Sequence, residues 1–527
     1  MPANSMILIP LNGPATMPSL LDHRSRRRLH RRPPAIGRSS AGRGTLLAVT
    51  TTSLLPDGFL FGVATAGFQI EGGFNGPGEP TNNWAAWERE GRIERSGAAN
   101  NFWINYLEQI ELAASVGLSS FRLSVEWSRV EPTPGNIDAE ALAGYGRILA
   151  AIEAAGMEPV VTLQHFTHPQ WLGDQPWRDP SNASRLVGWM ERAVAALGEH
   201  CSNWVTINEP NILSVNSFFT GIFPPGHMLD GAGLFTSFDT LLAAHVAAYD
   251  VIHGLQPDAV VTTNPYTFSI YELDQVATDL LTARPRGVAD SDIGSDLLER
   301  RREHYRRIGD GGSGATGTIE RFLRRFAASQ APVADALPVT RAALAASDAP
   351  RHLDVIAVDH YAPLAASHLW IPGAATAGGR WWKPGRALWD DAPDPAFFVT
   401  VLEEAAQYGR PVWVLENGMC QRTLRGRAHP RLDGVRRPAY LAEHIGAVVA
   451  AVESGIDIGG FWHWTLIDNY EWGSYEPRFG LFGLDRERDN TIKTTDDFGD
   501  DSAGALRSII EGLRGGDDTV IERPARR

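Results

Sequence analysis

The feature that most constrains the fold of this chain is an alternation of short β-rich runs with amphipathic helical segments. Eight β-rich runs can be marked, at residues 59–66, 119–127, 157–165, 203–209, 259–266, 353–361, 411–416 and 458–466. Helical segments lie between them, among others at 103–116, 138–155, 184–199, 235–254, 396–408 and 438–454. Eight βα units in one chain predict a single α/β domain, a closed (β/α)8 TIM barrel with long βα loops.

A doubly wound open sheet is the alternative fold for such an alternation. That fold, in its dinucleotide-binding form, carries a G-x-G-x-x-G fingerprint after the first strand. Here the first run continues as Phe61-Gly62-Val63-Ala64-Thr65-Ala66-Gly67, without that fingerprint. The sequence therefore favours the barrel and gives no support to dinucleotide binding.

The composition is that of one large globular domain. Of the 527 residues, 43% are hydrophobic and 21% are charged, and no linker separates two cores. We expect the catalytic domain over 54–515 and a C-terminal tail over 516–527. The longest irregular region, 267–352, is predicted to be an insertion after the fifth strand that forms a solvated helix and loop.

The first 53 residues differ in composition from the rest. Residues 1–50 contain eight arginines and a single acid, Asp22. We interpret 1–53 as a disordered Arg-rich extension or as the product of a mis-set translation start. A targeting segment is the alternative, because Arg-rich and acid-poor stretches also mark organelle transit peptides.

Charge and cysteine content restrict the partners and the compartment. The net charge of −14 argues against a basic surface for nucleic acid. No apolar run reaches the roughly 18–20 residues of a membrane-spanning helix. Two cysteines, Cys201 and Cys420, are too few for a disulfide framework. We expect a cytoplasmic protein without nucleic-acid or membrane partners, and the sequence allows a homo-oligomer.

Two glutamates stand where a barrel places its chemistry, at the carboxyl ends of strands. Glu209 ends the run Trp204-Val205-Thr206-Ile207-Asn208, and Glu416 ends Val412-Trp413-Val414-Leu415. Either one alone would more often be a solvated loop residue or an ion-pair partner. Two carboxyl groups facing each other across a barrel mouth are what glycosidic bond cleavage requires.

Motifs along the chain resemble those of glycoside hydrolase family 1, the family of retaining β-glucosidases and β-glycosidases. The resemblance spans roughly residues 55–490. The motifs are Phe59-Leu60-Phe61-Gly62-Val63-Ala64-Thr65, Gln69-Ile70-Glu71-Gly72, 121–129, Thr162-Leu163-Gln164-His165, 206–210, Glu416-Asn417-Gly418 and 464–480. The fold of that family is a (β/α)8 barrel, in agreement with the strand count.

The resemblance implies roles for both carboxyl groups and for three supporting residues. Glu209 would be the general acid/base and Glu416 the nucleophile that forms a covalent glycosyl-enzyme. Arg122 and Tyr361 match the positions that keep the nucleophile anionic, by charge and by a phenolic hydrogen bond. Asn208 matches the residue that binds the sugar 2-OH.

The same resemblance implies a substrate-binding set and no cofactor. An aromatic platform and polar side chains for the sugar hydroxyls are expected from Gln69, His165, Phe166, Trp464, Glu471, Trp472 and Phe479. No metal is expected, because Pro169 follows His168 and no carboxylate lies near His165 and His168 in sequence.

Three departures from the family pattern concern the site. Phe166 stands where the family most often has Trp, so an indole N–H is missing. The usual Asn-Tyr-Tyr after the sixth strand reads Asp359-His360-Tyr361, which would place an extra acid near Glu416 and raise its pKa. The loop from Trp472 to Phe479 is one residue shorter than expected.

These residues predict a retaining exo-β-glycosidase, first of all a β-glucosidase, acting on a small-molecule or oligosaccharide β-glycoside. Glu471 argues against a 6-phosphoglycosidase, because its carboxylate would repel a phosphate. A transglycosylase with the same two carboxylates is one alternative. A non-catalytic sugar-binding barrel is another, which would be expected to lack Glu209 or Glu416.

Overall fold

A computed structural model describes residues 53–268, 270–308, 332–361, 393–431, 433–486 and 490–524, and five single residues, Phe322, Arg325, Ser329, Trp389 and Arg488. The described part belongs to one compact unit, Thr51–Arg527. The prediction of a disordered extension over 1–53 falls, except for Ser53, outside the described residues.

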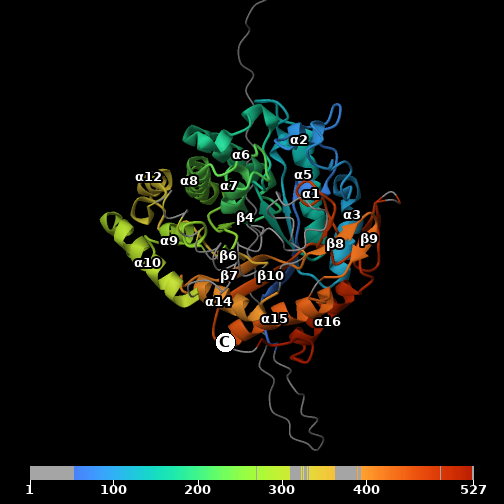
Figure 1. Ribbon diagram of the computed structural model, residues 1–527. Helices are drawn as coiled ribbons and strands as arrows, with labels where there is room; N and C mark the ends of the chain where they lie inside the picture. Colours follow the sequence, from blue (N-terminus) through green and yellow to red (C-terminus); the bar gives the residue numbers. More distant parts are fainter. Residues whose placement is uncertain are drawn as a thin grey trace, which may run out of the picture. The chain divides into compact units, whose positions relative to one another are not determined.

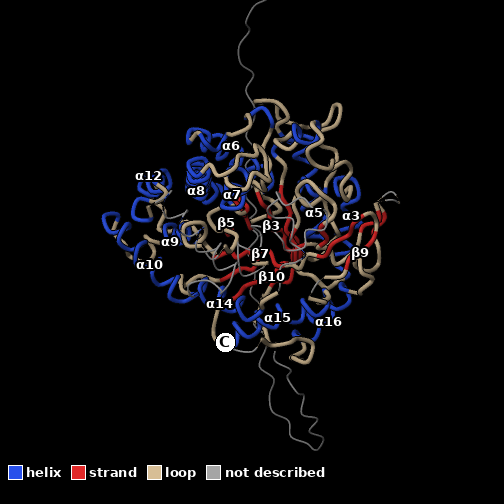
Figure 2. The backbone as a smooth tube through the Cα atoms, in the orientation of Figure 1, coloured by secondary structure: helices blue, strands red, loops and turns tan. Residues whose placement is uncertain are grey.

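Eight parallel strands form the central sheet of this unit (Figures 1 and 2). In chain order they are β1 (Leu60–Ala64), β2 (Ser120–Ser124), β3 (Glu158–Thr162), β4 (Asn203–Asn208), β5 (Val260–Asn264), β6 (Ile356–Asp359), β7 (Val412–Asn417) and β10 (Ile458–Trp464). Their spatial order is β5-β4-β3-β2-β1-β10-β7-β6. Between β5 and β6, Asp354 N donates to Val261 O at 3.1 Å, and Tyr266 and Asp359 form a parallel bridge, which brings the sheet near closure.

The barrel prediction is confirmed, and the doubly wound alternative is wrong. Seven of the eight β-rich runs contain one of the strands, and the run 411–416 covers all of β7 except its last residue, Asn417. Figure 1 shows helices surrounding the sheet, as a barrel of βα units requires. The predicted helical segments correspond to α3 (Phe102–Ser115), α5 (Ala139–Ala154), α6 (Ala183–Leu197), α8 (Gly231–Leu255), α14 (Pro395–Ala406) and α15 (Arg437–Glu453).

Aspartates begin several of the long helices. Asp138, Asp230 and Asp394 accept hydrogen bonds from backbone N–H groups in the first turns of α5, α8 and α14. Such caps satisfy donors that have no partner within the helix. A further capped helix, α16 (Ser502–Arg514), follows Asp501, and beyond it Glu522 N donates to Ala442 O at 3.1 Å.

Two layers of apolar side chains fix the strands in place. Inside the barrel, side chains such as Val160, Val205, Leu415 and Trp462 pack against one another. Outside it, the opposite faces of the strands pack against the surrounding helices in a larger core. Because both faces of each strand are covered, the strand ends are held firmly enough to position a site.

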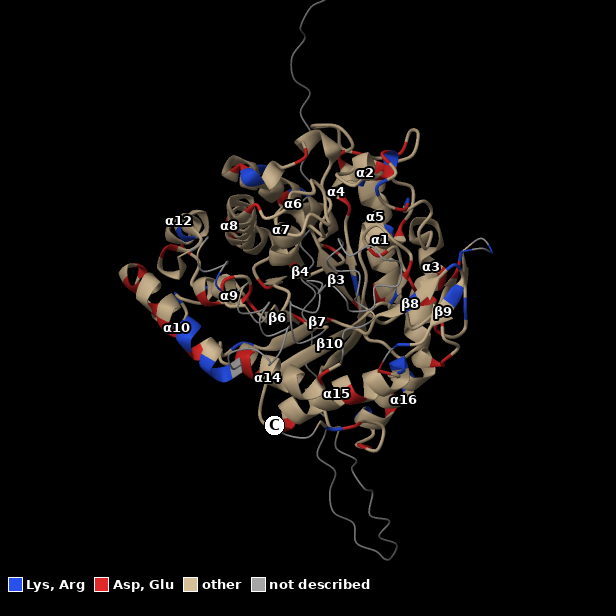
Figure 3. Ribbon diagram, viewed as in Figure 1, with Lys and Arg blue, Asp and Glu red and all other residues tan. Residues whose placement is uncertain are grey.

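The insertion after β5 is more ordered than the predicted solvated helix and loop. It contains α9 (Gln275–Leu281), α10 (Ile293–Ile308) and α12 (Pro338–Ala346), and Leu280, Leu281 and Leu297 are buried. The Arg-rich stretch lies on α10, where Figure 3 shows a concentration of basic residues. The prediction of a solvated helix holds for one face of α10, where Arg302, Arg306 and Arg307 are exposed, whereas Arg300 and Arg301 pair with the buried acids Asp279 and Glu272.

Shorter elements complete the described part of the unit. The helices are α1 (Gly67–Ile70), α2 (Ala85–Arg89), α4 (Trp127–Val130) and α7 (Pro210–Phe218), with 3-10 turns at Gln170–Leu172, Pro176–Arg178, Pro180–Asn182, Asp290–Asp292 and Val333–Asp335. Small strands are β8 (Gln421–Leu424), β9 (Arg427–His429), β11 (Pro477–Arg478), β12 (Leu484–Asp485) and β13 (Thr491–Ile492). Among the described residues, no helix combines the length and apolar character that crossing a bilayer would take.

Candidate active site

The residues of the predicted site lie on barrel strands or in the loops that follow their carboxyl ends, where side chains from different strands can meet. Arg122 is on β2, Asn208 ends β4 and Glu416 is on β7. The other members lie in the segments after β1, β3, β4, β6 and β10, except Trp464, which is the last residue of β10. They are Gln69, His165, Phe166, Glu209, Tyr361, Trp464, Glu471, Trp472 and Phe479.

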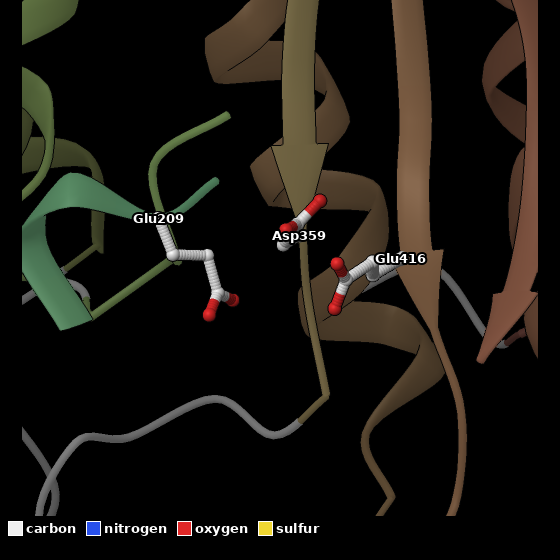
Figure 4. A group of neighbouring side chains, drawn as sticks. All are labelled: Glu209, Asp359 and Glu416. Carbon is white, nitrogen blue, oxygen red and sulfur yellow. The ribbon is translucent and has the colours of Figure 1, made fainter. Parts of the chain in front are cut away.

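Glu209 is held at the junction between β4 and α7. It is the residue before Pro210, the first residue of α7, and its backbone is left-handed with φ 38° and ψ 61°. A non-glycine residue in this region carries strain of about 1–3 kcal/mol, and such strain concentrates at functional sites. The turn directs the Glu209 side chain toward the strand ends of β6 and β7 (Figure 4).

Glu416 is buried on β7 between a cation and a phenol. Arg122 Nη1 donates to its Oε1 at 2.6 Å, and Tyr361 OH donates to its Oε2 at 2.7 Å. Gly418 follows two residues later, and an added Cβ there would overlap the carbonyl oxygen of Trp464. The strand end therefore has room for glycine alone, which explains the last residue of the Glu416-Asn417-Gly418 motif.

Asn208 joins the cation to the rest of the site. Arg122 Nη2 donates to its Oδ1 at 2.5 Å, and Asn264 Nδ2 donates to the same oxygen at 2.7 Å. Its own amide nitrogen faces His165 Nε2 at 3.2 Å. Because its oxygen accepts two hydrogen bonds, the Asn208 amide has a fixed orientation. It presents its N–H group beside the two carboxyl groups.

The acidic groups of the site are close together beside a cavity. Carboxylate oxygens of Glu209, Asp359 and Glu416 lie within 4.8 Å of one another. Figure 4 shows the three side chains as neighbours. A cavity of about 520 Å³ opens beside them, large enough for a small ligand. Nine of the predicted site residues line it, namely His165, Phe166, Glu209, Tyr361, Glu416, Trp464, Glu471, Trp472 and Phe479.

The surroundings act differently on the two catalytic candidates. Burial raises the pKa of Glu416, whereas the charge of Arg122 and the hydrogen bond from Tyr361 lower it. The pKa of Glu209 is raised well above its ordinary value by burial and by the charges of Glu416 and Asp359. Such unequal environments favour an ionised Glu416 beside a protonated Glu209.

Asp359 does not act as the sequence predicted. We expected it to raise the pKa of Glu416, but it is not among the groups that shift that carboxyl. Instead, burial and the charge of Glu416 raise the pKa of Asp359 itself well above its ordinary value. The reason is that Arg122 and Tyr361 stabilise the charge on Glu416, so the buried Asp359 is the group that becomes neutral.

Polar and aromatic groups gather at the other side of the cavity. Gln69 Nε2 donates to Glu471 Oε2 at 3.1 Å, and the Glu471 carboxyl also receives a side-chain hydrogen bond from Trp464. Burial raises the pKa of Glu471 to about 8. The His165 ring stacks on Trp464 and on Trp472, with centroids 5.8 Å apart in each pair. Hydroxyl-binding groups thus lie next to an aromatic surface.

Phe166 belongs to an aromatic wall of the cavity. Its ring centroid lies 5.0 Å from that of Trp472 and 5.1 Å from that of Phe223. Phe166 and Trp472 both have positive φ, as Glu209 has. Phe479 packs against Tyr361 with ring centroids 5.8 Å apart. At position 166 the phenylalanine gives this wall an apolar surface, where a tryptophan would have provided an N–H group.

Metal binding would require the three acids to act as ligands. Glu209, Asp359 and Glu416 are the one group of possible ligands found among the described residues. The Arg122 guanidinium already donates to Glu416 and provides the positive charge in this space. We therefore do not interpret the group as a metal centre.

Sequence reasoning missed several residues of the site. Asn264 ends β5 and contacts both Asn208 and Asp359, so the rule that polar strand ends carry function could have found it. Phe223 and Met228 line the cavity from the segment after α7. Nothing in their local sequence distinguishes them from core residues.

Comparison with known protein families identifies the chain. The family model described as "Glycosyl hydrolase family 1" matches residues 51–289 and 387–504, more than half of the sequence. The chain belongs to glycosyl hydrolase family 1. The resemblance stated from the motifs is thereby confirmed, and this family 1 protein is a glycoside hydrolase.

Characterised relatives of this family 1 enzyme carry several activities in their names. It is 27% identical to Beta-glucosidase 4 of Oryza sativa subsp. japonica, over 83% of this chain and 92% of that protein. It is 27% identical to the bifunctional beta-D-glucosidase/beta-D-fucosidase of Bifidobacterium breve, over 84% and 96%. It is 28% identical to a chloroplastic galactolipid galactosyltransferase of Arabidopsis thaliana, over 78% and 58%.

A solved structure with the same fold is that of the β-glucosidase from Thermotoga maritima in complex with galacto-hydroximolactam. It superposes with a TM-score of 0.64 and 21% sequence identity, over 87% of this chain and 99% of that one. At this level of identity the comparison establishes the fold of the family 1 enzyme, which agrees with the barrel described above.

Proposed function

We propose that this family 1 enzyme is a retaining exo-β-glycosidase that releases the terminal sugar of a neutral β-glycoside. The main substrates we propose are β-glucosides, which would make the enzyme a β-glucosidase. The observation that carries the proposal is the pair Glu209 and Glu416, whose carboxylate oxygens lie within 4.8 Å of each other beside the cavity. Retaining glycosidases hold their two carboxyl groups about 5–5.5 Å apart, whereas inverting ones leave about 6.5–9.5 Å for a water molecule.

In the first step, Glu416 attacks the anomeric carbon while Glu209 gives its proton to the leaving oxygen. The bond between sugar and aglycone breaks, and an ester between Glu416 and the sugar forms. The hydrogen bonds from Arg122 and Tyr361 keep Glu416 ionised and aligned before attack. Burial keeps the proton on Glu209.

In the second step, Glu209, now ionised, removes a proton from water as the water attacks the anomeric carbon. The ester breaks, and both carboxyl groups return to their starting states. Asn208 would bind the sugar 2-OH through its amide group, an interaction that strengthens as the ring flattens. Trp464 would support the apolar face of the ring.

The sugar preference rests on Gln69 and Glu471. These side chains are hydrogen-bonded to each other and offer acceptors to sugar hydroxyls. A carboxyl group at this position offers no positive charge to a phosphorylated sugar, and it repels the phosphate wherever it is ionised. The relatives named for glucosidase and fucosidase activity support neutral hexosides as substrates.

The test is hydrolysis of aryl β-D-glucoside, galactoside, fucoside and 6-phosphoglucoside by the purified protein, with the Glu416→Ala variant as blank. We expect cleavage of the neutral glycosides, no cleavage of the phosphorylated one and an inactive blank. Activity that survives in Glu416→Ala would overturn the assignment of the nucleophile. A folded wild-type protein that cleaves none of the panel would contradict the proposed function.

Transfer to an acceptor other than water is the second candidate function. It needs the same two carboxyl groups, because an alcohol can intercept the glycosyl-enzyme in place of water. The relative named as a galactolipid galactosyltransferase favours this reading. Adding an alcohol acceptor to the assay distinguishes the two: a transglycosylase forms mainly the new glycoside, and a hydrolase releases mainly the free sugar.

A further inference from the structure

Asp359 introduces a third carboxyl group into a space where the described part of the chain places one cation, Arg122. The residue ends β6, is fully buried and lies beside Glu209 and Glu416 (Figure 4). Among the described residues, Arg122 is the one guanidinium that donates to this group, and its hydrogen bonds go to Glu416, Asn208, Leu415 and Thr162. Three buried negative charges beside one positive charge would be unstable, so protons must neutralise part of the cluster.

The hydrogen bonds of Asp359 indicate where one proton resides. Its Oδ2 accepts a hydrogen bond from Asn264 Nδ2. Its Oδ1 is buried, and no N–H or hydroxyl group of the described residues donates to it. The side chain that remains as a hydrogen-bonding partner is Glu209, also a carboxyl group. Two carboxyl groups can form a hydrogen bond only when one of them carries a proton.

We propose that Asp359 is a positioning residue for Glu209: the two carboxyl groups share a proton through Asp359 Oδ1, and the pair keeps that proton to a higher pH than Glu209 alone would. The proposal rests on the acid/base role proposed for Glu209. When Asp359 is neutral it donates to Glu209, and when it is ionised its negative charge retains the last proton on the pair.

Other ionisable groups act on this pair from several elements. The charge of Glu416 raises the pKa of both Asp359 and Glu209, whereas the charge of Arg122 lowers both. Glu471, in the loop after β10, raises the pKa of Glu209. The charges of Asp359 and Glu209 in turn raise the pKa of Tyr361, which follows β6. All of these groups remain in place when Asp359 alone is changed.

The Asp359→Asn substitution imitates the protonated acid. An amide oxygen can accept from Asn264 as Oδ2 does, and an amide N–H can point at Glu209 from the position of Oδ1. The substitution therefore keeps the hydrogen bonds and removes one ionisation. We expect the basic limb of the kcat/KM profile to move down by one pH unit or more.

The matched control is Asp354→Asn, the same change five residues earlier, where the carboxylate contacts Tyr249 and Val261 N. Its basic limb should coincide with that of wild type. A basic limb that stays within about 0.3 pH unit of wild type in Asp359→Asn, or a uniform loss of activity at all pH values, would overturn the proposal.

Infrared difference spectroscopy of the wild-type protein tests the same point without turnover. A protonated carboxyl band should persist at neutral pH, lose one component in Asp359→Asn and shift in Glu209→Gln. If Asp359→Asn does not fold, the wild-type and Glu209→Gln spectra still decide: identical protonated-carboxyl bands in the two proteins overturn the proposal, because Glu126 and Glu471 contribute bands that Glu209→Gln leaves in place. If wild type cleaves no glycoside, the proposed function fails, while the spectra still test the shared proton.

Discussion

The Arg122 guanidinium lies 2.6 Å from the Glu416 carboxylate, and both side chains are buried. Arg122 also holds Asn208 at 2.5 Å, so one cation contacts both the proposed nucleophile and the amide proposed to bind the sugar 2-OH. A buried pair of this kind does not need to stabilise the fold to be useful. Its chemical effect is on the pKa of Glu416, which burial raises and the charge of Arg122 lowers.

Replacing Arg122 with Met should therefore move the acid limb of the pH profile to higher pH. Without the positive charge, the pKa of Glu416 rises and a larger share of the enzyme is protonated at the nucleophile. Removing one preorganised donor at a reacting group costs about 10²- to 10³-fold in rate, so kcat/KM should fall by about 100-fold or more. Arg122→Lys, which retains the charge, should show a smaller shift. An unchanged acid limb in Arg122→Met would contradict the role of Arg122.

Tyr361→Phe should reduce kcat/KM by about 10- to 100-fold, because the hydrogen bond to a charged group that it removes contributes about 1.5–3 kcal/mol. The acid limb should also move to higher pH, since the phenol lowers the pKa of Glu416. The measurement is the kcat/KM profile of the two proteins with one aryl glucoside. A variant with the wild-type rate and acid limb would show that the 2.7 Å contact has no catalytic effect.

Glu209→Gln should affect substrates according to their leaving groups. General acid catalysis contributes about 10²- to 10⁴-fold, so alkyl glucosides should lose that much activity. Glycosides of an acidic phenol need no proton, and their burst of released phenol should survive. Added azide should restore turnover of these glycosides, because it attacks the glycosyl-enzyme without a base. An equal loss for both kinds of leaving group would argue against Glu209 as the acid.

Sequence reasoning reached the barrel and the two glutamates for physical reasons. Buried parallel strands are continuous apolar runs, so their ends are easy to locate, and Glu209 and Glu416 stand directly at such ends. Asp359 was noticed as unusual, but its partner could not be deduced, because the contact between Asp359 and Glu209 depends on how far apart β4 and β6 lie.

Residues whose roles arise from distant packing were beyond sequence reasoning. From the sequence, Arg300 and Arg301 were expected to lie in a solvent-exposed run of charged residues. In the structure they pair with acids that lie more than 20 residues earlier in the chain. Phe223 reaches the cavity because it packs on Trp84 and Trp472, residues far from it in sequence. Only the folded chain brings these groups together.

Stability should fall as the pH rises from about 5 to 9, in part because of Glu126. This buried carboxyl accepts hydrogen bonds from Phe68 N and Thr167 Oγ1, and burial raises its pKa from 4.5 to about 8. Its protonated form stabilises the folded state fully below the unfolded pKa, and that contribution is lost as the pH rises through about 8.

The Tm measured across this range tests the effect. Glu126→Gln should show a shallower decline than wild type, and the exposed control Glu140→Gln should follow wild type. A Tm that rises with pH in this range, or a decline of equal slope in Glu126→Gln, would contradict the assignment to Glu126.

The central claim is that Glu416 forms a covalent glycosyl-enzyme, which makes the reaction a double displacement with net retention. The most direct measurement is proton NMR of the sugar first released from an aryl β-D-glucoside, recorded before mutarotation. We predict that the β anomer appears first and the α anomer later. An α anomer as the first product would show inversion and contradict the mechanism derived from Glu209 and Glu416.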